Sequence, residues 1–129
     1  MGGPRFDESI QFKGLRVAIM TVSDTRTEDT DKSGALLTHR LESAGHRLAE
    51  KRIDPDDIYR IRATLSRWIA DPDVQAVITT GGTGVTGRDG TPEAVQPLLD
   101  KTIDGFGEVF RALSYQDIGT STLQSRCIA

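Results

Sequence analysis

Residues 74–84 read VQAVITTGGTG, an apolar run that leads directly into a turn rich in glycine and threonine. The apolar and β-branched residues predict a buried strand, so Gly81 to Gly84 stand at its carboxyl end. Further on, Thr91-Pro92-Glu93 is typical of a helix start, with Thr91 as the cap and proline in the first turn. The segment therefore predicts a strand, a glycine turn and a helix, in that order.

The same alternation extends upstream. Residues 15–22 predict a buried parallel strand, and Ser33 is predicted to cap a helix that stops at Gly45. Residues 48–53 predict a weaker second strand. The next helix is predicted to bury one face, made of Ile58, Ile61, Leu65, Trp68 and Ile69. Strands alternating with helices predict an α/β fold with a mostly parallel central sheet covered on both faces.

The final part of the chain predicts one more helix. It begins beyond Gly105-Phe106-Gly107. The sequence then halts at Cys127-Ile128-Ala129, which we interpret as the entry to another element, so we expect part of the domain to be missing. A length of 129 residues suits a single domain, which we assign to residues 15–129 after a flexible leader of residues 1–14.

Composition excludes several classes of protein. A formal net charge of −3 gives no basic field for nucleic acid. A single cysteine and two histidines exclude an intramolecular disulfide and a Cys/His metal cluster within one chain. We find no signal peptide and no apolar run near the roughly 20 residues of a membrane helix. We therefore expect a soluble, cytoplasmic protein without a nucleic-acid or membrane partner.

The glycine turn predicts a phosphate-binding site. Glycine takes positive φ freely and has no side chain to block an anion, so backbone N–H groups can converge on one point. A tight turn without a ligand is the plainer alternative. The P-loop pattern fails because Arg88-Asp89 replace its Lys and Ser or Thr, and a dinucleotide-binding fold is doubtful because no acidic residue follows at a strand end.

Carboxylates near this turn suggest a metal ion. Asp89 would repel a bound phosphate unless a cation lay between them, and oxygen ligands with phosphate suit Mg²⁺. Asp56 could reach the same ion, although capping of a helix explains Asp56 or Asp57 equally well. Ser23-Asp24 ends the first strand, where the pair either faces the site or forms an ordinary turn.

Several motifs together resemble one family. The motifs are Thr21-Val22-Ser23-Asp24, Thr79-Thr80-Gly81-Gly82-Thr83-Gly84, Arg88-Asp89-Gly90-Thr91-Pro92-Glu93-Ala94, Gly105-Phe106-Gly107-Glu108 and the segment of residues 119–126. In this order they resemble the MoaB/Mog family of molybdenum cofactor biosynthesis, and the last segment is similar to its protein B branch. The resemblance runs from Arg16 to Ala129.

This resemblance implies a three-layer α/β/α molybdopterin-binding domain over residues 15–129. It also implies adenylylation of the terminal phosphate of molybdopterin with Mg-ATP and release of pyrophosphate. Asp89 and Asp56 match the family's essential aspartates and would hold Mg²⁺. The remaining matches are phosphate-binding or pocket positions, namely Gly81, Gly82, Thr83, Gly84, Ser23, Asp24, Glu108 and Ser125. The family's C-terminal loop has no counterpart here.

Two other functions remain open at this stage. A non-catalytic molybdopterin carrier or scaffold would bind without releasing pyrophosphate, and an unrelated nucleotide-binding module would bind ATP and ignore the pterin. The family resemblance also implies a homotrimer or homohexamer. Phe106, Phe110 and Tyr115 would then be buried between subunits, or alternatively would complete the core of one chain.

Overall fold

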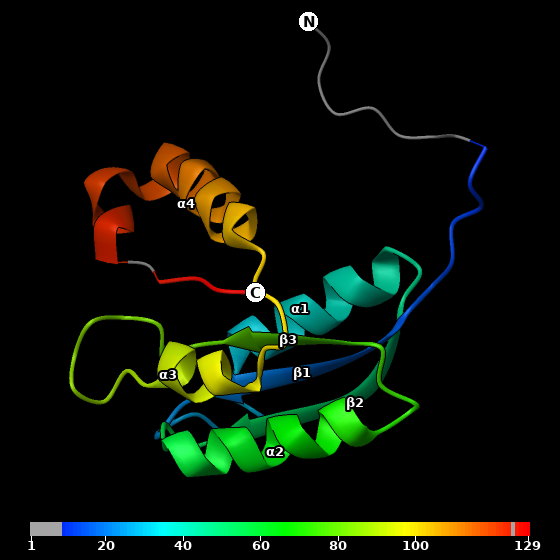
Figure 1. Cartoon of the computed structure of the whole chain (residues 1–129), viewed down its shortest axis with the longest axis horizontal. Helices are drawn as coiled ribbons and strands as arrows, with labels where there is room; N and C mark the ends of the chain where they lie inside the picture. The colour runs from blue at the N-terminus through cyan, green and yellow to red at the C-terminus, as the bar shows by residue number, and fades with distance from the viewer. Residues whose placement is uncertain (1–8, 125) are drawn as a thin grey trace, which may run out of the picture.

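The computed structural model describes residues 9–124 and 126–129, and these form one parallel sheet with helices on its two faces (Figure 1). The strand order is β2-β1-β3. The elements are β1 (Arg16–Val22), α1 (Lys32–Ser43), β2 (Arg47–Asp54), α2 (Ile58–Ala70), β3 (Ala76–Thr80), α3 (Thr91–Val95), η1 (Gln96–Leu98), α4 (Asp104–Ile118) and η2 (Gly119–Gln124). The predicted α/β fold with a parallel sheet is confirmed.

The central strand β1 has a buried side chain on each face in turn, because successive residues of a strand point to opposite sides. Ala18, Met20 and Val22 pack with α2 and α3, whereas Val17 and Ile19 pack with α1. The two small cores lie on opposite faces of the sheet, with α1 on one side and α2 on the other (Figure 1). The predicted three-layer arrangement follows from this alternation.

Two buried aspartates fix the ends of the strands. Asp31 accepts a hydrogen bond of 2.8 Å from the Thr21 hydroxyl, and Asp54 accepts one of the same length from Thr64. Both carboxylates are only 2% exposed, so each needs such donors to offset the cost of leaving water. These bonds lock β1 and β2 to the adjoining elements at the edge of the sheet where the strands end.

The structure corrects three predicted details. Asp31, not Ser33, caps α1 by accepting a hydrogen bond from the Gly34 N–H, and an aspartate carboxylate is a strong acceptor there. Ile69 is 64% exposed and does not belong to the buried face of α2. Helix α4 begins at Asp104, so the glycines of Gly105-Phe106-Gly107 lie inside the helix and not ahead of it.

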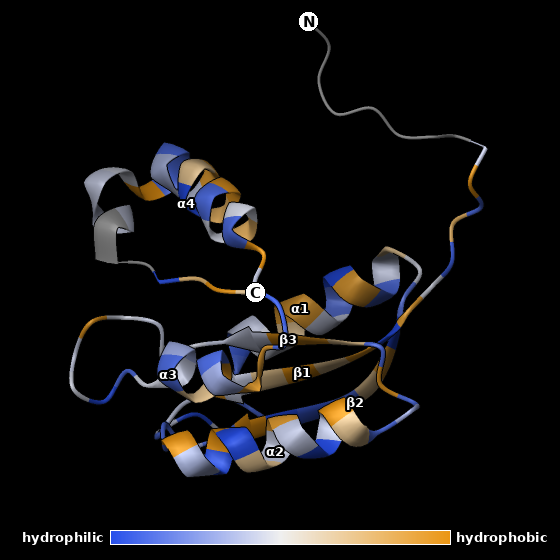
Figure 2. Ribbon diagram, in the orientation of Figure 1, coloured by the Kyte–Doolittle hydropathy of each residue, from blue (hydrophilic) through white to orange (hydrophobic). Residues whose placement is uncertain are grey.

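Helix α4 stands apart from the sheet and keeps apolar side chains in contact with solvent (Figure 2). Phe106, Phe110 and Tyr115 are 52%, 45% and 59% exposed. These residues therefore do not complete the core of the chain over the part that the structure describes. Within the same residues, no helix is both long enough and apolar enough to cross a membrane.

Glu50 links β2 to α2 and makes the fold sensitive to acid. Its carboxylate accepts two hydrogen bonds from Arg67 and one from the indole N–H of the fully buried Trp68. These donors lower the pKa of Glu50 from 4.5 to about 2, with the Arg67 bonds as the largest cause. The stabilisation is therefore present above about pH 4.5 and is lost as the pH falls toward 2.

Replacing Glu50 by glutamine should destabilise the protein by about 1 kcal/mol at pH 7, because two charge-assisted hydrogen bonds to Arg67 are weakened. Urea unfolding at several pH values measures this. The difference between Glu50→Gln and wild type should shrink as the pH falls from 4.5 toward 2. A difference independent of pH would contradict the role given to the charge.

Candidate active site

The site lies where the parallel strands end. Val22 of β1 pairs with Asp54 of β2, and Thr21 pairs with Thr80 of β3. The segments that follow the strands are therefore brought to one edge of the sheet, which is where ligands of open α/β sheets bind. Asp24, Asp56 and the turn that starts at Gly81 meet there.

The glycine turn needs its glycines. Gly81 and Gly82 have φ values of 94° and 68°, in the left-handed region that favours glycine. A Cβ on Gly82 would also collide with the hydroxyl of Thr91 and lie 2.9 Å from Asp56 Oδ2. The turn thus needs glycine both for its backbone conformation and for the close approach of the Thr91 and Asp56 side chains.

Thr91 closes this turn from the other side. Its hydroxyl donates a hydrogen bond of 2.8 Å to the Gly81 carbonyl, and its N–H donates one of 3.0 Å to the Gly82 carbonyl. The prediction that Thr91 caps the helix is wrong, since Gly90 is the N-cap and provides no side-chain bond. Helix α3 has only 5 residues, so it contributes little dipole to a bound anion.

Replacing Gly82 by alanine should cost about 1–2 kcal/mol of folding free energy, because an L residue is strained at this φ. Gly87 is the matched control: it belongs to the same loop, has no positive φ, and has no atom within 4 Å of the position that a Cβ would occupy. Gly87→Ala should change stability by less than about 0.5 kcal/mol. Urea unfolding of both variants checks this, and equal losses would contradict it.

Asp56 follows the end of β2, and its carboxylate contacts the glycine-rich loop. Its Oδ1 accepts a hydrogen bond of 3.1 Å from the Gly90 N–H, while Oδ2 accepts none from a described residue. The capping role left open for Asp56 or Asp57 belongs to Asp57, which accepts bonds from Tyr59 and Arg60. Asp56 is thus left for the site.

The pKa of Asp56 is raised. Burial is the largest cause, and the nearby negative charges of Asp89 and Asp24 add to it. Three carboxylates therefore act on one another around the glycine turn. A cation bound near them would lower this repulsion.

Asp24 is held in place by Arg88. The Arg88 Nη2 donates to Asp24 Oδ2 at 2.6 Å, and this bond is the largest cause of the lowered pKa of Asp24. The other oxygen of Asp24 accepts the Asp56 N–H at 3.0 Å. Asp24 thus connects the backbone of Asp56 to the loop that carries Arg88.

Asp89 is ordered by its own loop. Its Oδ2 accepts hydrogen bonds from the Thr86 hydroxyl at 2.6 Å and from the Thr86 N–H at 3.0 Å. These bonds lower the pKa of Asp89, with the hydroxyl as the largest cause. Asp89 therefore stays ionised when Asp56 has begun to take up a proton.

A magnesium ion fits this donor set only together with a ligand. Among residues 9–124 and 126–129, no group of three or more His, Cys, Asp or Glu side chains is arranged to hold a metal ion. Magnesium is commonly held by one or two carboxylates and by substrate phosphates. Asp56, with an oxygen that accepts no hydrogen bond from the described residues, and the ionised Asp89 match that pattern.

The remaining predicted positions fall in different places. Ser23 accepts hydrogen bonds from the Thr25 and Arg26 N–H groups, the arrangement of an ordinary turn. Glu108 lies on α4 beside a cavity of about 250 Å³ that none of the turn residues lines. Ser125 lies outside the described residues.

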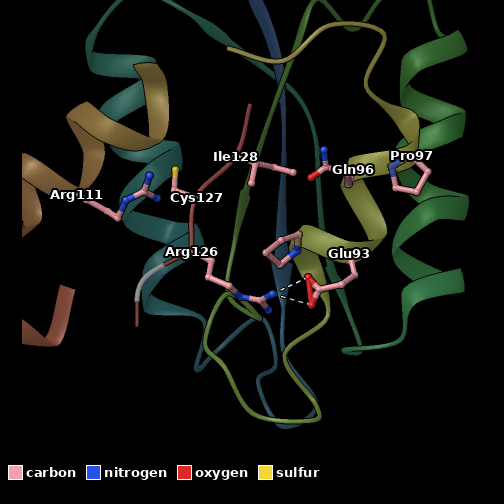
Figure 3. Close-up of a pocket in the computed structure, with 8 residues that line it drawn as sticks. Glu93, Gln96, Pro97, Arg111, Arg126, Cys127 and Ile128 are labelled. Atoms are coloured by element: carbon pink, nitrogen blue, oxygen red, sulfur yellow. Dashed lines mark hydrogen bonds and ion pairs between the residues drawn. The ribbon is translucent and has the colours of Figure 1, made fainter. Parts of the chain in front are cut away.

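Two arginines near the candidate site are not predicted as site residues by the sequence. Arg88 opens the motif of residues 88–94 and Arg126 ends the segment of residues 119–126, but neither motif indicates what these side chains contact. Arg126 donates to the Thr83 carbonyl and to the Asp89 carbonyl. It also donates to both oxygens of Glu93 (Figure 3). No spacing signal reveals such contacts, because Arg126 is 33 to 43 positions away from its partners.

A larger cavity of about 620 Å³ lies beside the turn and not on it (Figure 3). Residues 81–84 do not line it. Its walls come from α3, η1, α4 and the last residues, and include Glu93, Gln96, Arg111, Arg126, Cys127 and Ile128. The glycine turn stays the candidate site, because a backbone turn that binds phosphate is a surface of N–H groups and not an enclosed volume.

Comparison with known proteins identifies the family. A family model described as "Probable molybdopterin binding domain" matches residues 18–128. The chain belongs to the MoaB/Mog family. The Escherichia coli K12 member, named molybdenum cofactor biosynthesis protein B, is 52% identical over 121 residues, which are 94% of this chain and 71% of the relative.

Solved structures of the MoaB/Mog family share the fold. A crystal structure of molybdenum cofactor biosynthesis protein B is 50% identical in sequence to this chain, with a TM-score of 0.86. The match covers 90% of this chain and 73% of the chain in that crystal structure. The tungsten cofactor synthesizing protein MoaB from Pyrococcus furiosus is 39% identical with a TM-score of 0.80, covering 92% and 74%. The chain is thus a member of a molybdenum cofactor biosynthesis family.

Proposed function

We propose that this protein binds molybdopterin and Mg-ATP at the glycine turn and transfers AMP to the terminal phosphate of molybdopterin. The observation that carries the proposal is that Asp56 lies beside Gly82 and Asp89 beside Gly84 of the glycine turn. A glycine turn at a strand end suits phosphate, and two carboxylates next to it suit phosphate only when Mg²⁺ lies between them. Membership of the molybdopterin-binding family supports the pterin as one substrate.

The proposed reaction needs little activation of the nucleophile. An oxygen of the molybdopterin phosphate attacks the α-phosphorus of ATP. A new P–O bond forms, the bond to the bridging oxygen of the β-phosphate breaks, and pyrophosphate leaves with the electron pair. A phosphate monoester is already anionic, so no Ser/His/Asp arrangement is required to remove a proton.

The residues of the chain act by positioning. The turn of Gly81 to Gly84 presents backbone N–H groups to the phosphates, and Arg88 with Asp24 keeps Asp56 in place. Magnesium, when bound, neutralises charge at the transferred phosphate. Asp56 and Asp89 would hold it. Catalysis by placing and neutralising charge is characteristic of phosphoryl and nucleotidyl transfer.

Pyrophosphate release from ATP in the presence of Mg²⁺ and molybdopterin tests the proposal. Release that depends on both substrates supports an adenylyltransferase. Binding of molybdopterin without release would favour the non-catalytic carrier. Binding of ATP with no response to molybdopterin would favour a general nucleotide-binding module. The reaction should be measured in the cytoplasmic pH range, because cytoplasmic location remains our prediction for this chain.

We also propose that the protein assembles as a homotrimer or homohexamer. The exposed apolar side chains of α4 support this assembly. Contact of Phe106, Phe110 and Leu113 with water is unfavourable, so covering them with another subunit would lower the free energy. Analytical ultracentrifugation across a range of concentrations measures the number of copies. A monomer at all concentrations would overturn the assembly without affecting the proposed reaction.

A further inference from the structure

We propose that Arg126 is a positioning residue that fixes the distance between the glycine turn and Asp89. The inference rests on the proposed function, because it concerns how that site holds Mg²⁺ and phosphate. Its basis is that the guanidinium bridges two points of the chain on either side of the exposed loop of residues 85–88.

All three guanidinium nitrogens of Arg126 donate. Nε reaches the Thr83 carbonyl at 3.2 Å, and Nη2 reaches the Asp89 carbonyl at 2.8 Å. Nη1 reaches the two oxygens of Glu93 at 2.8 and 2.7 Å (Figure 3). The Arg126 backbone N–H also donates to the Thr83 carbonyl, at 3.2 Å. The side chain thus contacts both ends of the loop and helix α3.

The loop between these points has few constraints of its own. Residues 85–88 are exposed, and Gly87 has no atom in van der Waals contact with the place where a Cβ would stand. The Asp89 carboxylate is held by Thr86 of the same loop and by the backbone of Gly84, and Thr91 ties the far end of the loop to Gly81 and Gly82. Arg126 adds the bonds to the Thr83 and Asp89 carbonyls, and without them the loop and its carboxylate would be less fixed relative to the turn.

The planar guanidinium explains why arginine is needed. Its N–H groups point in fixed directions, so one side chain can hold two carbonyls and one carboxylate at once. A lysine keeps the charge but is a compact point charge on a flexible stem and cannot bridge the same three groups. Because its nitrogens are occupied by the protein, Arg126 acts through Thr83 and Asp89 and not on the reacting atoms.

An ordinary surface ion pair is the alternative. The Arg126 and Glu93 side chains are 33% and 46% exposed, and exposed pairs contribute roughly 0–1 kcal/mol. The two explanations differ in which partner matters. If the pair with Glu93 were the whole role, removing the charge of Glu93 would have the same effect as changing Arg126. If the carbonyl bonds matter, Glu93→Gln would have little effect.

Arg62 offers a matched control. It also donates to two backbone carbonyls, those of Glu93 and Ala94, at 2.9 and 3.1 Å. Both of these carbonyls belong to α3, and neither is in the loop of residues 83–89. Arg62→Lys therefore removes a similar arginine bridge without touching the distance between the turn and Asp89.

The test is calorimetric binding of inorganic pyrophosphate with Mg²⁺ to the wild-type chain, Arg126→Lys, Glu93→Gln and Arg62→Lys. We expect Arg126→Lys to weaken binding about tenfold, the loss of roughly one hydrogen-bonded constraint, and the other two variants to stay within about threefold. Equal binding by Arg126→Lys and wild type would overturn the proposal. So would an equal loss in Glu93→Gln.

Amide hydrogen exchange of residues 83–89 gives a second readout that needs no ligand. Arg126→Lys should speed exchange in this loop about tenfold while leaving the strand amides of β1 unchanged. If the wild-type chain does not bind Mg-pyrophosphate, the proposed function fails at this turn, and exchange alone decides the role of Arg126. Unchanged loop exchange would then overturn it, and uniformly faster exchange throughout β1 would show general unfolding and overturn it as well.

Discussion

Asp89→Asn should lower pyrophosphate release at least about 100-fold, since it removes a carboxylate proposed to hold the Mg²⁺ that neutralises charge at the transferred phosphate. The asparagine carbonyl can still accept the Thr86 N–H bond, so the loop is expected to keep its shape. The measurement is the rate of pyrophosphate release at saturating Mg-ATP and molybdopterin.

Asp100→Asn is a suitable control for the charge. Asp100 is exposed and lies between η1 and α4 in the chain. The Asp100→Asn substitution changes the net charge by the same amount as Asp89→Asn and should leave the rate of pyrophosphate release within about twofold of wild type. Wild-type turnover by Asp89→Asn would exclude Asp89 from the reaction. A rate lost in both variants would point to overall charge instead.

Asp56→Asn should have opposite effects on activity and on stability. Activity is expected to fall at least about 100-fold, because an oxygen ligand for Mg²⁺ is replaced by a neutral amide. Stability of the free protein at pH 7 should rise, because burial and the charges of Asp89 and Asp24 already oppose the ionised carboxylate of Asp56. Urea unfolding should show a higher midpoint with an unchanged slope.

The sign of the pH dependence follows from the raised pKa. An acid with a higher pKa in the folded state binds more protons folded than unfolded, so its effect on stability becomes less favourable as the pH rises through that pKa. The gain from Asp56→Asn should therefore vanish below the ordinary aspartate pKa of 3.8. A variant that is less stable than wild type at pH 7 would contradict the carboxylate repulsion.

The raised pKa of Asp56 also predicts how the activity falls at low pH. As the pH falls, Asp56 takes up a proton before Asp89, whose pKa is lowered by Thr86. The profile of kcat/KM reports groups of the free enzyme, so its acid limb should lie above the ordinary aspartate pKa of 3.8.

Much of the fold could be predicted because the sheet is parallel and buried on both faces. Dense apolar runs such as residues 15–22 are characteristic of such strands, and the helix on residues 58–70 shows a clear apolar spacing. Capping residues were less predictable. Ser33 and Asp31 are both suitable caps, and only the backbone geometry, with Asp31 bonded to Gly34, chooses between them.

The grouping of the candidate residues at the strand ends was predictable from the sequence. Gly81, Gly82, Asp56 and Asp89 could be selected because residues after parallel strands gather at one edge. The pair of Asp24 with Arg88 joins positions 64 apart, and no local pattern encodes it. Glu108 shows that a matching motif does not by itself place a helix residue next to the turn, since it lines a cavity that none of the turn residues lines.

The contacts of Arg126 also bear on the order of events during folding. β1, β2 and β3 involve residues 16–80, and these can pair as soon as that much chain is available. The ends of the 83–89 loop are tied together by a side chain 37 positions beyond Asp89. Chain closure over such separations is slower than local pairing. During synthesis, which proceeds from the N-terminus, a growing chain therefore forms its sheet first and acquires a fixed ligand site among its last steps.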